Sequence, residues 1–451
     1  MSGKAAAIVH QVQSGSTRAS KLLLVTVEGK TTTTDTVLTA ASGKTYSYPT
    51  FNNAGTKIAF YENNDGRVSV YDIAGKSVRT VAKIPNWSGP GQEQRIAWPG
   101  ADEGKWIYYH KPCSQGGKCR GGGTGEIWKV NIDDTTRNML VCDYKKVDSS
   151  ASFIDFALSA DGRYCVIRGI GDPNVPDALG YGCCIRPHTF PPKVNTQTGW
   201  IDPGLTAPGE NPGLIGWQCN SGISASGNLL CCFRALHTAL YGVSWNHEAD
   251  TLVATNPPAL FDMFKDLEPW MGSNYGDSPY LFMPRGSSNA DKIFTILVLW
   301  ENAQNFSNGS NLAVINWKDR DLKDAVMVTR SPLLGLYTGN NWIAEAGDFH
   351  LNGGPANSYQ DINGQWISLP TVTESRGGDR PVLRFSQSMP GTDAAIYSIT
   401  GRRVGDFRGG DLLQPAPGHL HIGAYIIAGQ GTAARRVVAG NKVQRTHGEE
   451  Y

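Results

Sequence analysis

The feature that most constrains this chain is a recurring strand, turn and strand unit built around a glycine. Residues 49–60 (PTFNNAGTKIAF) read as a strand, a polar turn ending at Gly55, and a second strand with alternating apolar side chains. The same plan returns in residues 95–109, 152–167 and 222–232. Polar turns with glycine between alternating strands are typical of β-hairpins. The series therefore predicts an all-β fold.

A second kind of hairpin alternates with the first. It has an aromatic or β-branched strand, a polar break and a shorter apolar strand, and it occurs in residues 67–81, 126–141, 239–254 and 312–328. One hairpin of each kind makes a four-stranded unit, and a repeat of about 45–65 residues predicts the blades of a β-propeller. Units that start at Pro49, Arg95, Ser152, Leu214, Pro279 and Trp342 predict six blades, with seven as the alternative.

The ring is expected to close with strands from both ends of the chain. The last unit has an opening strand at residues 342–349 but no hairpins after it. Residues 5–11, 22–27 and 36–40 read as strands that lack an opening partner. Pairing these segments completes one blade and removes free sheet edges. We therefore expect residues 1–352 to form a closed propeller.

The turn sequences carry a resemblance to a known family. The strings NNAGTKIAF and SADGRYCVI, with a polar pair, a glycine and then an apolar strand, resemble the repeats of TolB-type six-bladed propellers. The resemblance covers about residues 5–352 and implies a ring that binds ligands at its channel mouth or across one face. This sequence departs from the family in lacking the proline before Asp-Gly and in carrying long insertions in blades three and four.

The last part of the chain has a different character. Residues 353–378 are rich in Gly, Asn and Ser and are expected to be a linker, whereas residues 379–443 show short alternating strands typical of a small sandwich. The strings IYSITGRRVGDF and GAYIIAG resemble the Ig-like C-terminal sorting domains of type IX secretion cargo and the FlgD-type Ig module. That resemblance implies an exported bacterial protein. Such signals lack the tail at residues 444–451, so a purely structural Ig-like module is the alternative.

The net charge and the hydropathy of the chain exclude some classes of binding partner. The chain has 41 Lys and Arg against 40 Asp and Glu, which removes the electrostatic case for nucleic acid or an acidic membrane. The longest apolar stretches, such as residues 293–300, are far below the roughly 20 residues that span a bilayer. The first residues lack the apolar core of a signal peptide. We expect an extracellular or cell-surface protein whose leader has been removed, with a cytoplasmic protein as the alternative.

The nine cysteines all lie between residues 113 and 232. Cys113 and Cys119 bracket the polar loop SQGGK, which could bring the two sulfurs together across a hairpin. We predict a disulfide there. Buried thiols and a zinc site are the alternatives, although the chain lacks the CxxC-like pairs that zinc usually takes.

Aromatic residues beside Pro, Gly or Ser are the candidates for ligand binding, because flat rings stack on sugars. The long insertion at residues 171–213 adds further candidates, since irregular insertions of this length are often functional. The predicted ligand-binding residues are Trp87, Trp200, Trp270, Arg186 and His188. The alternative interpretation is that tryptophans fill the gaps between blades.

Catalytic and metal motifs are weak in this sequence. There is no GxSxG nucleophile elbow, and His110, His188, His237 and His247, which lie in the predicted propeller, form no HxH or HxxxH pair. We predict no catalytic residues and no metal site. The acidic turns at residues 62–65 and 172–177 leave calcium as an alternative to ordinary turn chemistry.

The favoured function is therefore non-catalytic binding of a glycan or an extracellular protein by an exported propeller. Two alternatives remain open: a carbohydrate-active lyase or hydrolase working at the channel mouth, and a structural subunit of an extracellular assembly. Some TolB-like propellers are metal-dependent pectin-fragment lyases, which keeps the lyase alternative open. Assembly into a homo-oligomer is also left open.

Overall fold

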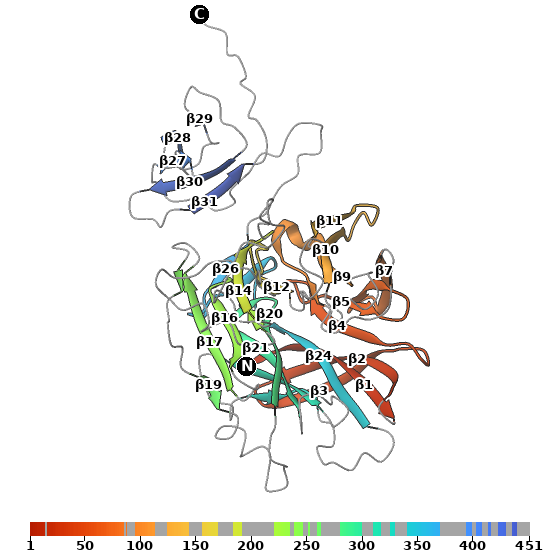
Figure 1. Cartoon of the computed structure of the whole chain (residues 1–451). Helices are drawn as coiled ribbons and strands as arrows, with labels where there is room; N and C mark the ends of the chain where they lie inside the picture. Colours follow the sequence, from red (N-terminus) through yellow and green to blue (C-terminus); the bar gives the residue numbers. More distant parts are fainter. Residues whose placement is uncertain are drawn as a thin grey trace, which may run out of the picture. The chain divides into compact units, whose positions relative to one another are not determined.

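The architecture was analysed in a computed structural model of the whole chain (Figure 1). The structure describes residues 1–13, 16–84, 87, 95–112, 124–143, 156–169, 184–191, 221–234, 239–246, 251–252, 259–262, 280–299, 310–316, 325–329, 341–369, 394–398, 403–407, 414–415, 423–429 and 435–439. The chain divides into two compact units, Met1–Leu369 and Pro370–Tyr451. Each unit is described by itself.

One sheet of the first unit joins the two ends of that unit. Its order is β24 (Asn341–Leu351), β1 (Ser2–Gln13), β2 (Ser16–Glu28) and β3 (Thr31–Thr39). β1 pairs antiparallel with β24 from Gly3 opposite Leu351 to Val12 opposite Asn341, and Figure 1 shows these strands side by side. The expected pairing of the N-terminal strands with residues 342–349 is therefore confirmed.

The next two sheets are four-stranded antiparallel meanders, as the alternation of two hairpin kinds predicts. The first contains β4 (Tyr46–Phe51), β5 (Lys57–Glu62), β6 (Arg67–Asp72) and β7 (Ser77–Lys83). The second contains β8 (Ile96–Ala97), β9 (Trp106–Pro112), β10 (Thr124–Asn131) and β11 (Asn138–Asp143), with the short 3-10 helix η1 (Ala101–Gly104) between β8 and β9.

Three further sheets complete the first unit as the structure describes it. The strands β12 (Phe156–Leu158), β13 (Tyr164–Gly169) and β14 (Cys184–Thr189) form one sheet. The strands β15 (Ser221–Ile223), β16 (Leu229–Arg234), β17 (Ala239–Asn246), β18 (Thr251–Leu252) and β19 (Ala259–Asp262) form another. The last contains β20 (Tyr280–Ser287), β21 (Ala290–Leu299), β22 (Ser310–Asn316) and β23 (Val326–Met327), together with β25 (Ser358–Gln360) and β26 (Trp366–Ser368).

The first strands of these sheets surround a common axis. β24 contacts β4, β4 contacts β8, β8 contacts β12, β12 contacts β15, β15 contacts β20, and β20 contacts β24. Because each sheet extends outward from its first strand, this closed series is a propeller arrangement. The unit is all-β, and within the described residues no helix is long and apolar enough to cross a membrane.

The recurring glycine turns explain the repeat seen in the sequence. Gly55, Gly162 and Gly227 have φ values of 64°, 69° and 82°, a left-handed conformation that glycine adopts without steric cost. The N–H of each glycine donates to the carbonyl three residues earlier, at distances of 2.9, 2.9 and 3.0 Å. Each turn therefore joins the first and second strands of a sheet in the same way, at the same end of the ring.

Part of the segment expected to be a linker is structured instead. β25 and β26 lie within residues 353–378 and pair antiparallel with each other, and Gln360 of β25 pairs in parallel with Ala290 of β21. The first unit extends to Leu369 for this reason. The strands are only three residues long, so their alternation was too short to detect in a Gly-rich sequence.

The second unit contains one antiparallel sheet among its described residues. Its order is β29 (Gln414–Pro415), β28 (Arg403–Phe407), β27 (Ala394–Ser398), β30 (Gly423–Gly429) and β31 (Arg435–Ala439). These strands coincide with the predicted strands near residues 394, 423 and 434, whereas the expected strand at residues 381–385 lies outside the described residues.

Candidate functional site

The first strands of the propeller sheets line an axial cavity of about 40 Å³. A space of this size accommodates a few water molecules. Its polar lining comes from several sheets: Thr50, Ser159, Arg285, Ser287, Ser288 and Asp348. The cavity is therefore narrow, and apolar residues such as Phe156, Leu158 and Ile223 share its lining with these polar groups.

Asp348, on β24, is the fully buried acid of this cavity, with 0% exposure. Its carboxylate accepts hydrogen bonds from the Phe51 N–H at 2.8 Å, the Thr50 hydroxyl at 3.1 Å and the Phe349 N–H at 2.8 Å. Two of these donors lie on β4, so the carboxylate binds the neighbouring sheet to the strand that closes the ring.

Arg285, on β20, binds across the axis. Its guanidinium donates to the carbonyl oxygens of Pro49 at 2.7 Å and Ile96 at 2.8 Å, on β4 and β8. The Pro49 carbonyl is available because β4 has an irregularity between Ser47 and Thr50, where Tyr48 takes a left-handed φ of 50°. A non-glycine residue in this conformation is strained and needs support from its surroundings.

The two axial charges partly compensate each other. Burial raises the pKa of Asp348, while the Arg285 guanidinium and the N–H donors of Phe51 and Phe349 oppose that rise. Burial lowers the pKa of Arg285, and the Asp348 carboxylate opposes the fall. The donors and acceptors of this pair are directed at neighbouring strands. The arrangement connects four sheets, and we interpret it as a structural clasp.

The turn end of the axis is covered by residues 353–369, which we call the cap hairpin. Asn53 donates through Nδ2 to the Ser358 carbonyl at 2.9 Å, and the Gln360 N–H donates to the Asn289 carbonyl at 2.8 Å. Leu369 is 2% exposed and packs against Ala160 and Ala225 in the turns of two further sheets. The cap hairpin therefore contacts turns from several sheets at once.

Gly100, which lies between β8 and η1, allows the cap hairpin to pack closely on the ring. A Cβ atom at this position would lie 2.4 Å from Cδ1 of Leu369 and 2.7 Å from Cβ of Asn53. The turns also bind one another, since the Gly100 N–H donates to the Ala160 carbonyl and the Ala160 N–H to the Ala225 carbonyl, both at 2.7 Å. A belt of hydrogen bonds thus runs beneath the hairpin.

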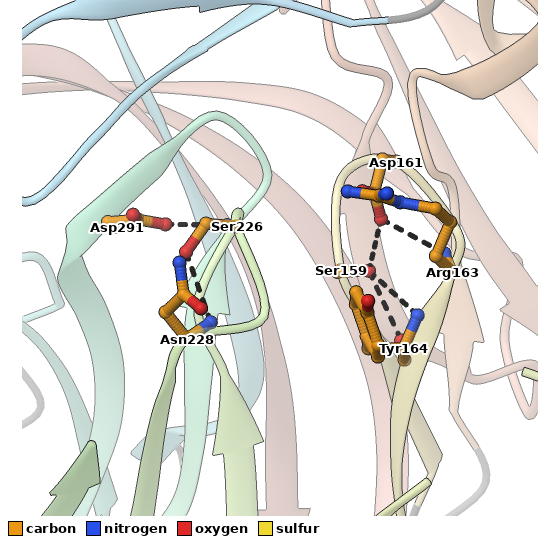
Figure 2. A network of polar contacts seen from close by, with 7 residues as sticks. All are labelled: Ser159, Asp161, Arg163, Tyr164, Ser226, Asn228 and Asp291. Atoms are coloured by element: carbon orange, nitrogen blue, oxygen red, sulfur yellow. Dashed lines mark hydrogen bonds and ion pairs between the residues drawn. The ribbon is translucent and has the colours of Figure 1, made fainter. Parts of the chain in front are cut away.

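Two buried carboxylates lie in this belt, and Figure 2 shows both. Asp161 accepts from the Ser159 hydroxyl at 2.6 Å and pairs with Arg163. Asp291, which is 3% exposed, accepts the Ser226 N–H at 2.6 Å. Burial is the main cause that raises the pKa of Asp291 to about 6, although its hydrogen bonds with Ser226 oppose the rise.

Trp87 is the predicted ligand-binding tryptophan that the structure describes. It is half-buried and packs on the turn between β5 and β6, where a Cβ atom on Gly66 would lie 2.3 Å from its Cγ. That turn is at the end of the sheet opposite the glycine turn between β4 and β5. Trp87 also contacts the main apolar core, so it combines partial exposure with a packing role.

The other predicted site residues have different outcomes. Arg186 and His188 lie on β14, opposite Ile167 and Cys165 of β13, so a regular strand replaces the irregular insertion expected there. Trp200 and Trp270 lie outside the described residues, as do Cys113 and Cys119 and the acidic turn at residues 172–177.

The acidic turn at residues 62–65 uses its side chains within the fold. Asp65 pairs with Lys44, Glu62 accepts from the Ser69 hydroxyl, and Asn63 accepts from Ser47 at 2.7 Å. These contacts are turn and strand chemistry. Among the described residues no cluster of three or more His, Cys, Asp or Glu side chains could hold a metal ion.

Two histidines, His110 and His10, are also buried. His110 is fully buried, and burial together with the nearby Arg95 lowers its pKa to about 3, which keeps the imidazole neutral. His10 lies between two other polar groups on adjacent strands, with the Ser20 hydroxyl 2.7 Å from Nδ1 and Glu345 Oε2 3.6 Å from Nε2.

The Ser20, His10 and Glu345 trio has the composition of a hydrolase triad, and sequence reasoning missed it because the three residues come from three strands. Ser20 is 0% exposed, so no substrate carbonyl reaches its oxygen in this structure. The trio therefore acts as a buried polar ladder across β2, β1 and β24. Only the strand pairing of His10 opposite Ser20 could have revealed it.

Comparison with known proteins gives distant likenesses. No family model matches the sequence, and no curated protein matches it. Solved structures similar to this chain include TolB from Acinetobacter baumannii, with 13% identity, 77% of this chain and 65% of that chain covered, and a TM-score of 0.42. This chain therefore spans about two thirds of the length of that TolB.

Two further structures have similar values. A TolB-like protein from Agrobacterium tumefaciens is 11% identical, with 77% of this chain and 99% of that chain covered and a TM-score of 0.39. A chain of a nidogen and laminin complex is 10% identical, with 77% and 98% covered and a TM-score of 0.42.

Proposed function

We propose that this chain is an exported bacterial protein in which a six-bladed propeller, followed by an Ig-like module, binds a glycan without catalysis. The six-blade count is supported by the closed series of contacts among the first strands of the sheets. The Ig-like assignment is supported by the resemblance of the strand sequences and by the antiparallel sheet of the second unit.

The observation that carries the binding proposal is the difference between the two ends of the ring. At the turn end, the cap hairpin packs Leu369 into the recess formed by Ala160 and Ala225. Inside, the axial cavity is only about 40 Å³, and Arg285 and Asp348 direct their polar atoms at neighbouring strands. A saccharide therefore meets the ring at the opposite end, where Trp87 lies.

The surroundings of Trp87 suit a sugar. The adjoining turn carries Asn64 and the ion pair between Lys44 and Asp65, and these side chains stay partly exposed beside the indole although they bind within the fold. A half-buried indole beside such groups combines an apolar face with polar contacts, as carbohydrate sites require. A protein partner would use the same aromatic anchor, so the test must separate the two ligand classes.

The test is a glycan array and a polysaccharide pull-down with metal-depleted and metal-supplemented protein, while released products are monitored. Trp87→Ala is compared with Trp366→Ala, a matched control, because Trp366 is also half-buried and also packs on a glycine, Gly354, but lies on the cap hairpin. We expect Trp87→Ala to weaken binding about tenfold or more and Trp366→Ala to leave it unchanged.

Other outcomes would decide between the alternatives. Product release by the wild-type chain would overturn the non-catalytic part of the proposal. Absence of binding to every glycan, with capture of an extracellular protein that depends on Trp87, would replace the glycan by a protein partner. Export is tested by fractionating cells that make the protein, and recovery solely from the cytoplasm would contradict it.

A further inference from the structure

The cap hairpin rests on the ring through contacts with many turns. It receives a hydrogen bond from Asn53, donates one to Asn289, and inserts Leu369 between Ala160 and Ala225. Pro99, Ser159, Ala160 and Ser288, from the same end of the ring, also line the axial cavity. Movement of the hairpin away from the ring would therefore expose the turns that line this end of the cavity.

The interface beneath the hairpin brings acidic groups together. Gln360 pairs in parallel with Ala290, which places Tyr359 and Asp361 of the hairpin near Asp291 of the ring, where their charges interact. Tyr359 also interacts electrostatically with Asp161. Burial and these two ring carboxylates raise the pKa of the Tyr359 hydroxyl.

Two cations oppose this accumulation of negative charge. Arg163 pairs with Asp161 and faces Tyr359, and Lys292 lies close to the hairpin, since a Cβ on Gly364 would be 3.7 Å from its Nζ. The turn that carries Ser224 and Ser226 adds only neutral donors to Asp291. Asp361 is the charged group that raises the pKa of Asp291, in addition to its burial.

We propose that the cap hairpin is a pH-sensitive lid over the turn end of the ring, and that acid holds this lid closed more firmly because closure buries Asp291 beside Asp361 and Tyr359. The contacts of the hairpin define the closed state. Exposure of Asp291 to water defines the open one.

The direction of the pH effect follows from proton binding. In the closed state the pKa of Asp291 is about 6, whereas an exposed Asp has a value of 3.8. The closed state therefore holds a proton over a range in which the open state has lost it, so acidification through this range favours closure. With these two values, the closed-to-open ratio rises about tenfold between about pH 7.5 and about pH 5.

Amide hydrogen exchange measures this ratio directly. The Gln360 N–H donates to the ring at Asn289, so its protection reports whether the hairpin is seated. After correction for the intrinsic pH dependence of exchange, we expect its protection to be about tenfold greater near pH 5 than near pH 7.5. The Phe294 N–H in β21, between two paired strands, is the internal reference for opening of the ring.

Variants identify the responsible acid. Asp291→Asn keeps an oxygen that can accept the Ser226 N–H but cannot titrate, so its Gln360 protection should be high and independent of pH. Asp361→Asn should raise protection near neutral pH, because it removes the facing charge. Asp65→Asn, at the opposite end of the ring, should keep the wild-type slope.

Two results would overturn the lid. The first is equal corrected protection of Gln360 near pH 5 and near pH 7.5 in the wild-type chain, which decides the matter even if a variant does not fold. The second is an unchanged slope in Asp291→Asn. Both outcomes are independent of glycan binding at the Trp87 end, so failure of the lid and failure of the proposed function are distinguishable.

Discussion

Replacement of Asp348 by Asn tests whether the axial clasp holds the ring together. The side chain keeps its shape but loses its charge, and one carboxylate oxygen becomes an NH₂ group. The oxygen Oδ2 accepts from two donors, the Phe51 N–H and the Thr50 hydroxyl, and Oδ1 accepts from the Phe349 N–H. The new NH₂ group faces a donor whichever way the amide is turned.

The magnitude follows from the bonds that are lost. A hydrogen bond to a charged group contributes about 1.5–3 kcal/mol, and the new NH₂ group breaks at least one of the three bonds and leaves the others without a charged acceptor. Burial of the Arg285 guanidinium without the opposing Asp348 charge adds to this cost. We expect Asp348→Asn to lower the free energy of unfolding by about 3–5 kcal/mol.

The assay is guanidinium unfolding followed by tryptophan fluorescence and by amide exchange of β1, which pairs with β24. Asp65→Asn is the control, since its carboxylate meets Lys44 at the surface, and we expect its midpoint to stay close to wild type. A wild-type midpoint for Asp348→Asn, or a loss equal to that of the control, would refute the clasp.

The remaining predictions concern histidine titration and strand spacing. Burial lowers the pKa of His350 to about 4. Between about pH 6.5 and about pH 4 the unfolded chain therefore binds a proton at this histidine that the folded chain does not bind. The free energy of unfolding should fall by roughly 3 kcal/mol over this range. His350→Gln should flatten this slope in denaturant titrations at each pH, and an unchanged slope would contradict the assignment. Gly286→Ala should cost about 3 kcal/mol or more, because its Cβ would lie 1.9 Å from the Ile223 carbonyl oxygen. Gly75→Ala, whose nearest neighbour would be 3.2 Å away, is the control in the same thermal melts, and equal melting temperatures would be evidence against close packing of β15 on β20.

Local rules predicted the strands and turns because each is encoded by neighbouring residues. The glycine turns at Gly55, Gly162 and Gly227 need a left-handed residue, which the sequence displays directly. Closure of the ring was also predictable, since the last unit lacked strands that the N-terminus supplied. The strand that carries Arg186 and His188 was not predicted, because β14 lies within a long insertion whose strand character is weak, and the ligand-binding role of these residues stays a prediction.

The axial clasp and the cap hairpin could not be predicted in this way. Asp348 finds Thr50 and Phe51 only because closure brings β24 against β4, and nothing near Asp348 in the sequence indicates this. Likewise, Leu369 is one apolar residue at the end of a polar segment, and its recess is formed by two turns distant in the sequence. Contacts between elements, which no local pattern contains, create both features.

Asn289 separates opening of the lid from opening of the ring. Its carbonyl accepts the Gln360 N–H of the cap hairpin, whereas its side chain donates to the Leu351 carbonyl at 2.9 Å and accepts the Leu351 N–H at 2.8 Å. The side-chain bonds hold the end of β24, the strand that closes the ring, and they do not involve the hairpin. Lifting of the hairpin therefore breaks the bond to the Asn289 carbonyl while the paired bonds to Leu351 persist, so the lid can open over a ring that remains closed.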